Sequence, residues 1–413
     1  MTETLHDSIV SGVRPVMLDG KSSYISRDSL RTIVEEFFYN QFRHIQDPEV
    51  PTFVFISKDA RLAMGLGGVV RMRGWFDWGG AIPANGFIPT LIPMNPDPTK
   101  MRKFGTTPAG TCLYFRIVGH SDLVRSYQLY IEANFNGWNG LGFNLKQAYA
   151  MVNSWTIGYT NSTFSDPAAV SPTVDAQGPN NKLSNNSVLV RYMPRLGKHL
   201  LLAVSAETPA TQIDADGVDT KGIDNFVPDG AAFIQYDWGY NRAQHVRLAG
   251  IVRSLAYRDM LSKRNHYKAG WGLQLSAVTH PIKELTTYTT VNYGHGYAGL
   301  TGDLMLGAYD LVSHPDKPGE LYAPASMGWS VGLQYNFRPE LFTSVTVSEN
   351  VYIPDDSMPG TEYKRGWFGC VNVFWNLTPR IQVGAEYDLG SRVNFDGAHR
   401  LAHRVGALCQ FAF

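Results

Sequence analysis

The sequence predicts an all-β fold, a transmembrane antiparallel β-barrel of about sixteen strands preceded by a short N-terminal amphipathic helix. Three observations lead to this prediction. Strand-length segments alternate apolar with polar residues, the connections between them alternate between short and long, and the composition is rich in glycine and aromatic residues. The alternation along a single strand and the composition also fit a soluble sheet protein, so the prediction depends on the pattern of short and long connections as well.

The last twelve residues show the alternation most clearly, because a strand places successive side chains on opposite faces. One face is mostly apolar and aromatic and comprises His403, Val405, Ala407, Cys409, Phe411 and Phe413. The other face is small or polar, with Arg404 as its cation and Leu408 as an exception. Such a strand fits lipid on one side and a wet lumen on the other. The inner strand of a soluble sandwich remains the alternative at this stage.

Composition narrows the class of protein. The chain has 413 residues, with 40 Gly, 21 Tyr, 21 Phe and 9 Trp, and contains no apolar run long enough for a membrane helix. The formal net charge is zero, which gives nucleic-acid binding no support. Cys112, Cys370 and Cys409 are scattered without metal-ligand spacing, so we expect packing residues, no metal and no cofactor. The first residues contain neither the basic segment nor the apolar segment of a signal peptide, and we expect that a signal peptide has been removed or left out. On this observation alone, a cytoplasmic protein remains an alternative.

Residues 1–60 are predicted to form an N-terminal periplasmic arm and helix. Helical spacing links Leu30, Ile33, Val34, Phe37, Phe38, Phe42 and Ile45, with Asp28 as a candidate N-cap and Pro48 as the stop. Three positions for this helix are compatible with the pattern. It plugs the lumen, covers the periplasmic mouth, or joins a helix bundle in an oligomer.

Residues 61–413 are predicted to form the barrel. The expected strands are 62–77, 111–119, 125–135, 143–152, 155–163, 186–193, 199–207, 231–238, 245–257, 266–280, 285–299, 327–337, 341–352, 363–376, 380–389 and 401–413. Every second connection is short, as at Val152 to Trp155 and Phe337 to Glu340, whereas 78–110, 164–185, 208–230 and 300–326 are long. Transmembrane barrels have this pattern of short periplasmic turns and long extracellular loops, which a soluble propeller or sandwich does not predict.

A family resemblance becomes specific between Gln147 and Asn180. Gln147-Ala148-Tyr149, then Trp155, Gly158 and Thr160, then Phe164-Ser165-Asp166-Pro167 and Gly178-Pro179-Asn180 resemble the DcaP-like outer-membrane porins, as does Tyr130 to Phe135. The resemblance covers about residues 50–190. It implies a bacterial outer-membrane barrel in contact with lipid, usually a homotrimer, that passes small anionic organic solutes such as dicarboxylates. It does not imply an enzyme.

The third long-side connection, at about 161–186, is expected to fold inward and narrow the pore, as the third extracellular loop commonly does in trimeric porins. The family pattern makes Asn161, Ser162, Asp166 and Asn180 candidates for the constriction. The alternative is a surface loop whose Pro and Asn residues only form turns.

Cations on inward positions are candidates for solute contact, because an arginine fork suits a carboxylate. The pore-lining candidates are Arg71, Arg73, Arg116, Lys146, Arg191, Arg247, Arg253, Arg404, Tyr130 and Glu132, with Tyr114 and Tyr149 as further stacking surfaces. For Tyr149 a lipid-facing position is an equal alternative. The alternative is that these arginines pair with inward acids such as Glu132, Glu386 and Asp388 and only stiffen the wall.

Two other functions compete with a diffusion channel. One is a lipase- or protease-type barrel enzyme, which needs a Ser/His/Asp cluster near one rim; the sequence shows no convincing one. The other is an adhesin that binds through its loops while the barrel is plugged. The acidic loop at 207–230 argues against anions at the mouth, and its Asp214, Asp216 and Asp219 form a weak calcium candidate without EF-hand spacing.

Overall fold

The computed structural model describes residues 14–16, 42–44, 53–57 and 61–413, apart from 81, 120, 122, 125, 137–140, 184, 240–241 and 356–357. The predicted helix at about 28–48 therefore lies almost entirely outside the described residues. Of that segment only Phe42 to His44 are described, and these three residues are not helical. No helix in the described part of the chain has the length and apolar character needed to cross a membrane.

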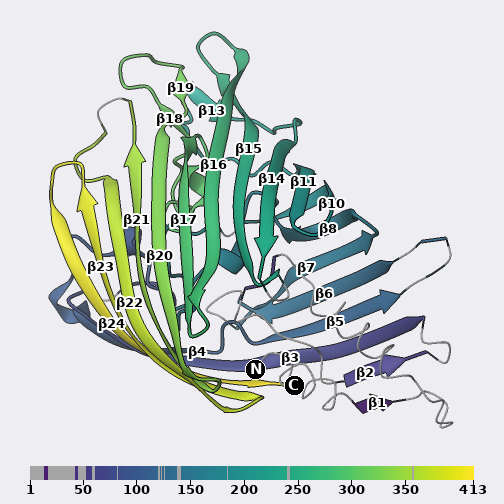
Figure 1. Cartoon of the computed structure of the whole chain (residues 1–413). Coiled ribbons are helices and arrows are strands. Elements are labelled where there is room, and N and C mark those ends of the chain that lie inside the picture. Colours follow the sequence, from purple (N-terminus) through teal and green to yellow (C-terminus); the bar gives the residue numbers. More distant parts are fainter. Residues whose placement is uncertain are drawn as a thin grey trace.

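Sixteen antiparallel strands pair in chain order and close into a barrel, as predicted (Figure 1). They are β3 (Leu62–Trp78), β5 (Cys112–Gly119), β6 (Tyr127–Phe135), β7 (Phe143–Val152), β8 (Trp155–Asn161), β9 (Asn186–Tyr192), β11 (Leu200–Glu207), β14 (Asp229–Trp238), β15 (Gln244–Asp259), β16 (Arg264–Ile282), β17 (Leu285–His295), β20 (Ala325–Arg338), β21 (Leu341–Ile353), β22 (Tyr363–Thr378), β23 (Ile381–Asn394) and β24 (His399–Ala412).

The barrel closes between the last strand and the first. β24 pairs with β3 from His403 opposite Trp78 to Ala412 opposite Val69. Below this seam the same edge of β3 pairs with β2 (Phe53–Ile56), which pairs in turn with β1 (Arg14–Val16). Closure leaves the wall without a free edge along the seam, which is what a sheet in lipid requires.

The remaining strands are short. β4 (Arg102–Thr107) extends the pairing of β3 beyond β5, and β10 (Arg195–Leu196) and β13 (Thr220–Gly222) also belong to the main sheet. β12 (Ile213–Asp214), β18 (Leu311–Ser313) and β19 (Leu321–Tyr322) form a separate three-stranded sheet. Four 3₁₀ turns are described in the connections: η1 (Pro89–Leu91), η2 (Pro98–Lys100), η4 (Pro167–Ala169) and η6 (Ala298–Leu300). None of these elements was predicted.

The two faces of the wall match the predicted alternation. On β20, Val331 and Leu333 are 42% and 45% exposed, whereas Ser330 and Gln334 are each 5% exposed. The outward face is thus apolar and the inward face polar, the reverse of a soluble protein. Leu408, the apolar exception on the inward face of β24, packs inside against Val174.

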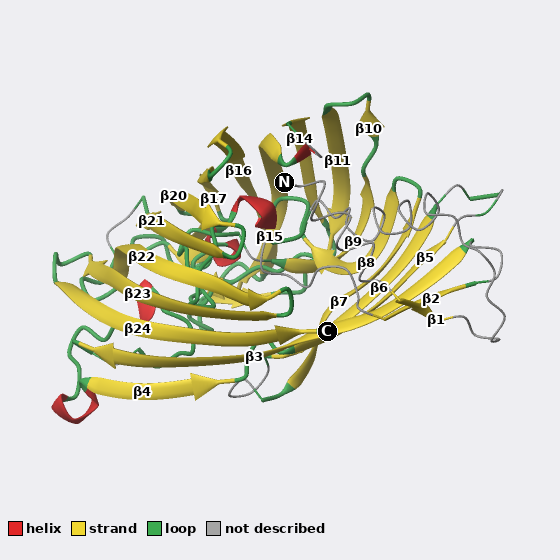
Figure 2. Cartoon of the chain, turned by 60° about the horizontal axis from the view of Figure 1, so that its bottom comes forward, coloured by secondary structure: helices red, strands yellow, loops and turns green. Residues whose placement is uncertain are grey.

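The connections fall into two sets at opposite ends of the barrel. Two residues join β7 to β8, β16 to β17, β20 to β21 and β22 to β23. At the other end, the first loop (residues 79–111), third loop (162–185), fourth loop (208–228) and sixth loop (296–324) are long. The turn after β16 is Lys283-Glu284, slightly later than predicted, because β16 continues through Pro281 to Ile282. Figure 2 shows loop segments within the space that the strands enclose.

Candidate functional site

The third loop folds into the barrel and contacts the far wall. Ser171 Oγ lies 2.6 Å from Thr346 Oγ1 on β21. The backbone N–H of Asn180 donates to Ser348 Oγ on the same strand, at 3.1 Å. Thr346 and Ser348 alternate with exposed valines, so both lie on the inward face. The loop therefore crosses the lumen.

Asp166 is one anchor of the third loop. Its Oδ2 lies 2.9 Å from Nε2 of His245 on β15 and accepts a hydrogen bond from Ser276 Oγ on β16. Arg247 Nη1 lies 3.6 Å from Asp166 Oδ1. Burial by itself would raise the pKa of Asp166, but Arg247 and His245 outweigh it and hold the pKa well below its usual range. Asp166 is thus an ionised anchor.

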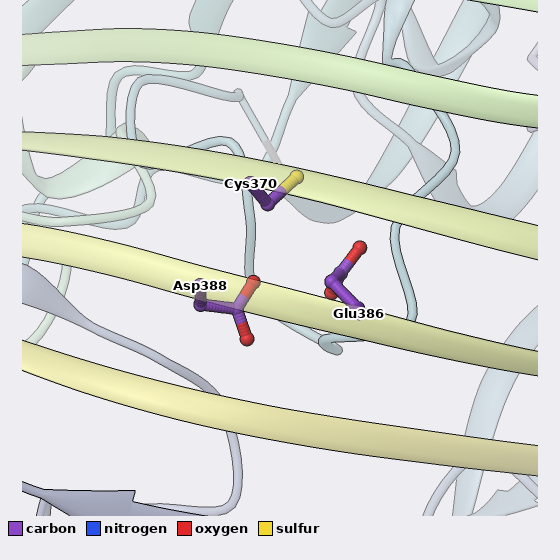
Figure 3. Close-up of side chains that lie close together, drawn as sticks. All are labelled: Cys370, Glu386 and Asp388. Carbon is purple, nitrogen blue, oxygen red and sulfur yellow. The ribbon is translucent and has the colours of Figure 1, made fainter.

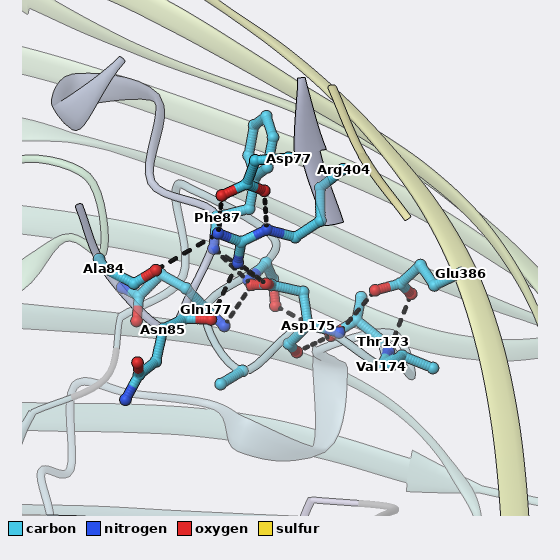
Figure 4. Close-up of polar contacts among 12 residues, drawn as sticks. Asp77, Ala84, Asn85, Phe87, Thr173, Val174, Asp175, Gln177, Glu386 and Arg404 are labelled. Carbon is cyan, nitrogen blue, oxygen red and sulfur yellow. Dashed lines mark hydrogen bonds and ion pairs between the residues drawn. The ribbon is translucent and has the colours of Figure 1, made fainter. Parts of the chain in front are cut away.

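Arg404 on β24 forms a second anchor, shown in Figure 4. Its Nε and Nη2 donate to the two carboxylate oxygens of Asp77 on β3, at 2.7 and 3.1 Å. Its Nη1 donates to Asp175 Oδ2 in the third loop, at 3.1 Å, and to the Asn85 carbonyl. Nη2 also donates to the Ala84 carbonyl in the first loop. One buried guanidinium therefore joins two loops to the wall.

Glu386 on β23 holds the same part of the third loop from the side. Its Oε2 accepts hydrogen bonds from the backbone N–H of Val174 and from Asn372 Nδ2, both at 2.8 Å. Its Oε1 accepts from the backbone N–H of Asp175. The side chain of Asp175 also accepts from the backbone N–H of Phe87 in the first loop. Residues 173–178 are thus fixed from three directions (Figure 4).

Asp303 in the sixth loop joins all three inward loops. It accepts hydrogen bonds from the backbone N–H of Thr90 at 2.9 Å, from Asn180 Nδ2 at 3.1 Å and from the hydroxyl of Tyr363. Burial raises the pKa of Asp303, although these donors oppose the rise. Inward folding therefore involves the first and sixth loops as well as the third.

Five of the predicted pore-lining arginines are buried. Arg116 on β5 is 6% exposed, and Arg191, Arg247, Arg253 and Arg404 are 2%, 0%, 4% and 1% exposed. Arg253 donates to Asp229 at 3.1 Å and to Asp310 at 3.0 Å. Arg191 Nε donates to Thr163 Oγ1 at 2.8 Å, and its Nη2 donates to the Asn161 carbonyl. Arg191, Arg247, Arg253 and Arg404 thus hold loops against the wall, and the contacts described for them do not include Glu132, Glu386 or Asp388, the acids of the alternative interpretation.

The other predicted cations lie on β3, β5 and β7. Arg71 and Arg73 are partly exposed neighbours on the inward face of β3. A Cβ on Gly110 would lie 3.1 Å from Arg71 Nη1 and 3.3 Å from Arg73 Nη1, so both guanidinium groups approach this glycine. Arg71 Nε donates to Gln410 at 2.8 Å, and Arg73 Nη1 donates to the Ala109 carbonyl at 2.9 Å.

Three tyrosines on adjacent strands line the wall beside these arginines. The ring centroids of Tyr114 and Tyr130 are 6.0 Å apart, and those of Tyr130 and Tyr149 are 5.3 Å apart. Arg116 lies over the Tyr130 ring, 4.8 Å from its centroid. Tyr149 is buried inside the barrel, so it does not face lipid, which the sequence left open.

Glu132 connects this tyrosine row to a cation. Its Oε2 accepts a hydrogen bond from the Tyr130 hydroxyl, and its Oε1 lies 3.0 Å from Lys146 Nζ. The Lys146 side chain is 31% exposed, whereas that of Glu132 is 2% exposed. The lysine is therefore the member of this pair that reaches water.

Phe42 occupies the lumen close to two of the buried arginines. Its ring centroid is 3.9 Å from the guanidinium carbon of Arg191 and 5.3 Å from that of Arg247. The residue is 5% exposed and packs with Phe233 on β14. His44 Nε2 lies 3.1 Å from the Val170 carbonyl in the third loop. A piece of the N-terminal region therefore lies under the third loop.

Among the remaining predicted residues, Asn161 contacts the N-terminal region, whereas the side-chain hydrogen bonds of Ser162 and Asp216 are local. Asn161 Nδ2 donates to the Phe42 carbonyl at 3.4 Å, and Ser162 Oγ accepts from the backbone N–H of Phe164. Asp216 Oδ1 accepts three backbone hydrogen bonds, from Val218, Asp219 and Thr220, which is the pattern of a loop-closing turn. The acidic side chains of the fourth loop do not converge on a common point among the described residues.

Sequence reasoning missed Asp77, Asp175 and Asp303, and it placed Phe42 on the apolar face of the predicted helix without placing it beside the buried arginines. Asp77 lies on the inward face of a predicted strand, which was a usable signal. Asp175 and Asp303 gave no signal, because their roles depend on contacts between segments far apart in the chain.

The solved structures most similar in fold are outer-membrane channels and porins. The outer membrane channel DcaP of Acinetobacter baumannii superposes with a TM-score of 0.72 at 20% identity, covering 87% of this chain and 99% of that one. An anion-selective porin from Comamonas acidovorans gives 0.57 at 10% identity, covering 85% and 100%. A loop-deletion mutant of OmpT, an outer membrane protein of Vibrio cholerae, gives 0.52 at 9% identity, covering 86% and 100%.

No protein-family model and no curated protein matches the sequence. The similarity to the solved DcaP structure confirms, at the level of the fold, the resemblance noted in the sequence. The chain has the β-barrel fold of these outer-membrane proteins.

Proposed function

We propose that this protein is a porin of a bacterial outer membrane, through which small anionic organic solutes such as dicarboxylates diffuse passively, and that it assembles as a homotrimer. A closed barrel with an apolar outer face is the β structure that spans such membranes. The similar solved structures named as an outer membrane channel and as an anion-selective porin agree with this proposal.

Arg73 is the observation on which the anionic preference rests. Its side chain is partly exposed on the inner wall, and its Nη1 donates to a carbonyl oxygen. Among the described residues, its Nε is a buried atom without a hydrogen-bond partner, and no ion pair joins Arg73 to a carboxylate. The positive charge of Arg73 is therefore not neutralised by a fixed acid of the wall, and it attracts a solute carboxylate.

The other charged groups near Arg73 also favour the passage of anions. Arg71 approaches the same glycine, and Lys146 extends to water from the tyrosine row. Asp77, Asp175 and Glu386, by contrast, are buried and already accept several hydrogen bonds each. The inner wall therefore presents cations to a solute and keeps most of its acids covered, which favours anions.

The test is single-channel recording in a planar bilayer under a salt gradient, with succinate then added. We expect conductance in three steps, an anion-signed reversal potential and block by succinate. Arg73→Gln should shift the reversal potential towards cations and weaken succinate block. Arg264→Gln removes the same charge at an exposed strand end and should change neither.

The outcomes separate the parts of the proposal. Absence of conductance from folded, inserted protein would contradict the porin. Conductance with a cation-signed reversal potential would contradict the anionic solute class and leave the channel standing. A single conductance step would contradict the trimer alone.

A further inference from the structure

A thiol and two carboxylates converge on the inner wall beside Arg404. Cys370 on β22 lies directly opposite Asp388 on β23, and Glu386 precedes Asp388 by two residues on the same face. One ligand atom from each of the three lies within 4.8 Å of the others, and the residues are 5%, 3% and 1% exposed. Figure 3 shows the three side chains together. Within the described part of the chain, no other group of three such residues is this close.

Within the described part of the chain, no N–H group donates a hydrogen bond to Asp388, although Arg404 is its neighbour and the carboxylate of Glu386 lies beside it. It lies opposite Arg404 in the pairing of β23 with β24. The five N–H groups of Arg404 donate to Asp77, Asp175, Asn85 and Ala84, so none remains for Asp388. Both carboxylate oxygens of Asp388 are buried, and neither has a hydrogen-bond donor among the residues that the structure describes. Burying a carboxylate without a hydrogen-bond partner costs folding free energy unless another group neutralises its charge.

The three ligand types indicate the kind of compensating group. A thiolate is a soft ligand that binds zinc and similar transition-metal ions, whereas calcium and magnesium take oxygen ligands. Zinc accepts mixed sulfur and carboxylate ligands and favours four-coordination. Asp388 offers two unoccupied oxygens, and Oε1 of Glu386 accepts only one hydrogen bond, from Asp175.

We propose that Cys370, Glu386 and Asp388 form a binding site for a divalent transition-metal ion, with zinc as the best match, in the lumen wall. The three residues supply one sulfur and two oxygen ligands, and the fourth position is left for water. The ion neutralises Asp388, which Arg404 leaves uncompensated. This site is independent of the proposed porin function, because its assay measures binding to the folded chain.

The site also adjoins the third loop. Glu386 accepts the backbone hydrogen bonds of Val174 and Asp175, so an ion at its Oε1 lies next to the point where the loop is held. Metal occupancy should therefore slow proteolysis within residues 173–178.

Titration of the full-length folded protein in detergent tests the site. The protein is first treated with a chelator, then titrated with Co²⁺, whose bond to a thiolate gives a charge-transfer absorption, and with Zn²⁺ in competition. We expect one Co²⁺ per chain, displaced by Zn²⁺. Cys370→Ser should abolish the absorption, whereas Cys112→Ser and Cys409→Ser, which lie elsewhere on the wall, should retain it.

Asp388→Asn provides a second variant of nearly identical shape. We expect at least about tenfold weaker binding, since it removes a charged ligand. Absence of the charge-transfer band in the wild-type protein, or its survival in Cys370→Ser, would overturn the proposal. If Cys370→Ser does not fold, as judged by heat-modifiable gel mobility, the Asp388→Asn variant provides the test instead. An unchanged Co²⁺ affinity of Asp388→Asn would also overturn the proposal.

Discussion

The ring of Phe42 lies against the guanidinium group of Arg191, 3.9 Å from ring centroid to carbon, inside the barrel and beneath the third loop. An aromatic face attracts a cation, and the attraction grows when water is excluded. Phe42 therefore occupies space between charged groups that a solute would otherwise approach.

Replacing Phe42 with alanine should raise single-channel conductance, because the ring fills part of the lumen. The lost contacts with Arg191 and Arg247 are each of the order of 0.5–2 kcal/mol. Bilayer recordings of the variant and the wild type measure the effect directly. Phe226→Ala, at a residue 80% exposed in the fourth loop, is the matched control. Equal conductance in all three proteins would show that Phe42 does not obstruct the path.

The anion preference should decrease as the pH rises through about 8. Lys182 in the third loop has a pKa lowered to about 8, chiefly by burial and further by Arg73, although Asp175 opposes the shift. Because the charged form is the protonated one, Lys182 is cationic below this pH and neutral above it. Reversal potentials of wild type and Lys182→Met at pH 7 and pH 9 are the measurement. Their difference should be present at pH 7 and small at pH 9; a constant difference would contradict the assignment.

Asp77→Asn should destabilise the folded barrel strongly. The substitution leaves the buried Arg404 without its two-pronged carboxylate partner, and breaking a buried pair in this way costs about 3–5 kcal/mol. Urea unfolding of protein in lipid vesicles gives the free energy of unfolding. Asp97→Asn, an exposed acid in the first loop, should change it by less than about 1 kcal/mol. Similar values for the two variants would count against Arg404 as a central anchor.

Asp166→Asn should loosen the third loop. The amide keeps the shape of the side chain but loses the attraction of Arg247 and His245. Since the pKa of Asp166 is depressed, its stabilising contribution is present above about pH 4 and is lost only as the pH falls further, towards the folded-state pKa. Limited proteolysis within 162–185 should therefore be slow in the wild type at both pH 7 and pH 5, and faster in the variant at both. Equal cleavage rates in the two proteins would show that Asp166 does not hold the third loop in place.

The wall could be predicted from the sequence and the interior could not. Alternation such as Val331 and Leu333 against Ser330 and Gln334 is a local signal, because period two alone assigns each residue to lipid or lumen. The pairing of Arg404 with Asp77 and Asp175 spans 327 and 229 residues, and no local pattern indicates which acid meets which base. Inward position therefore identified the right arginines as lumen-side residues, but not which of them remain exposed to a solute.

The direction in which the third loop is held has a consequence for biogenesis. Its partners on the later strands, His245, Ser276, Thr346, Glu386 and Arg404, are 79 to 229 residues further along the chain. Contacts of such long range form slowly, since the intervening chain must be ordered first. The loop can therefore complete its contacts only after the last strand, β24, has been added to the wall. A chain truncated before β24 would lack the arginine that holds the third loop.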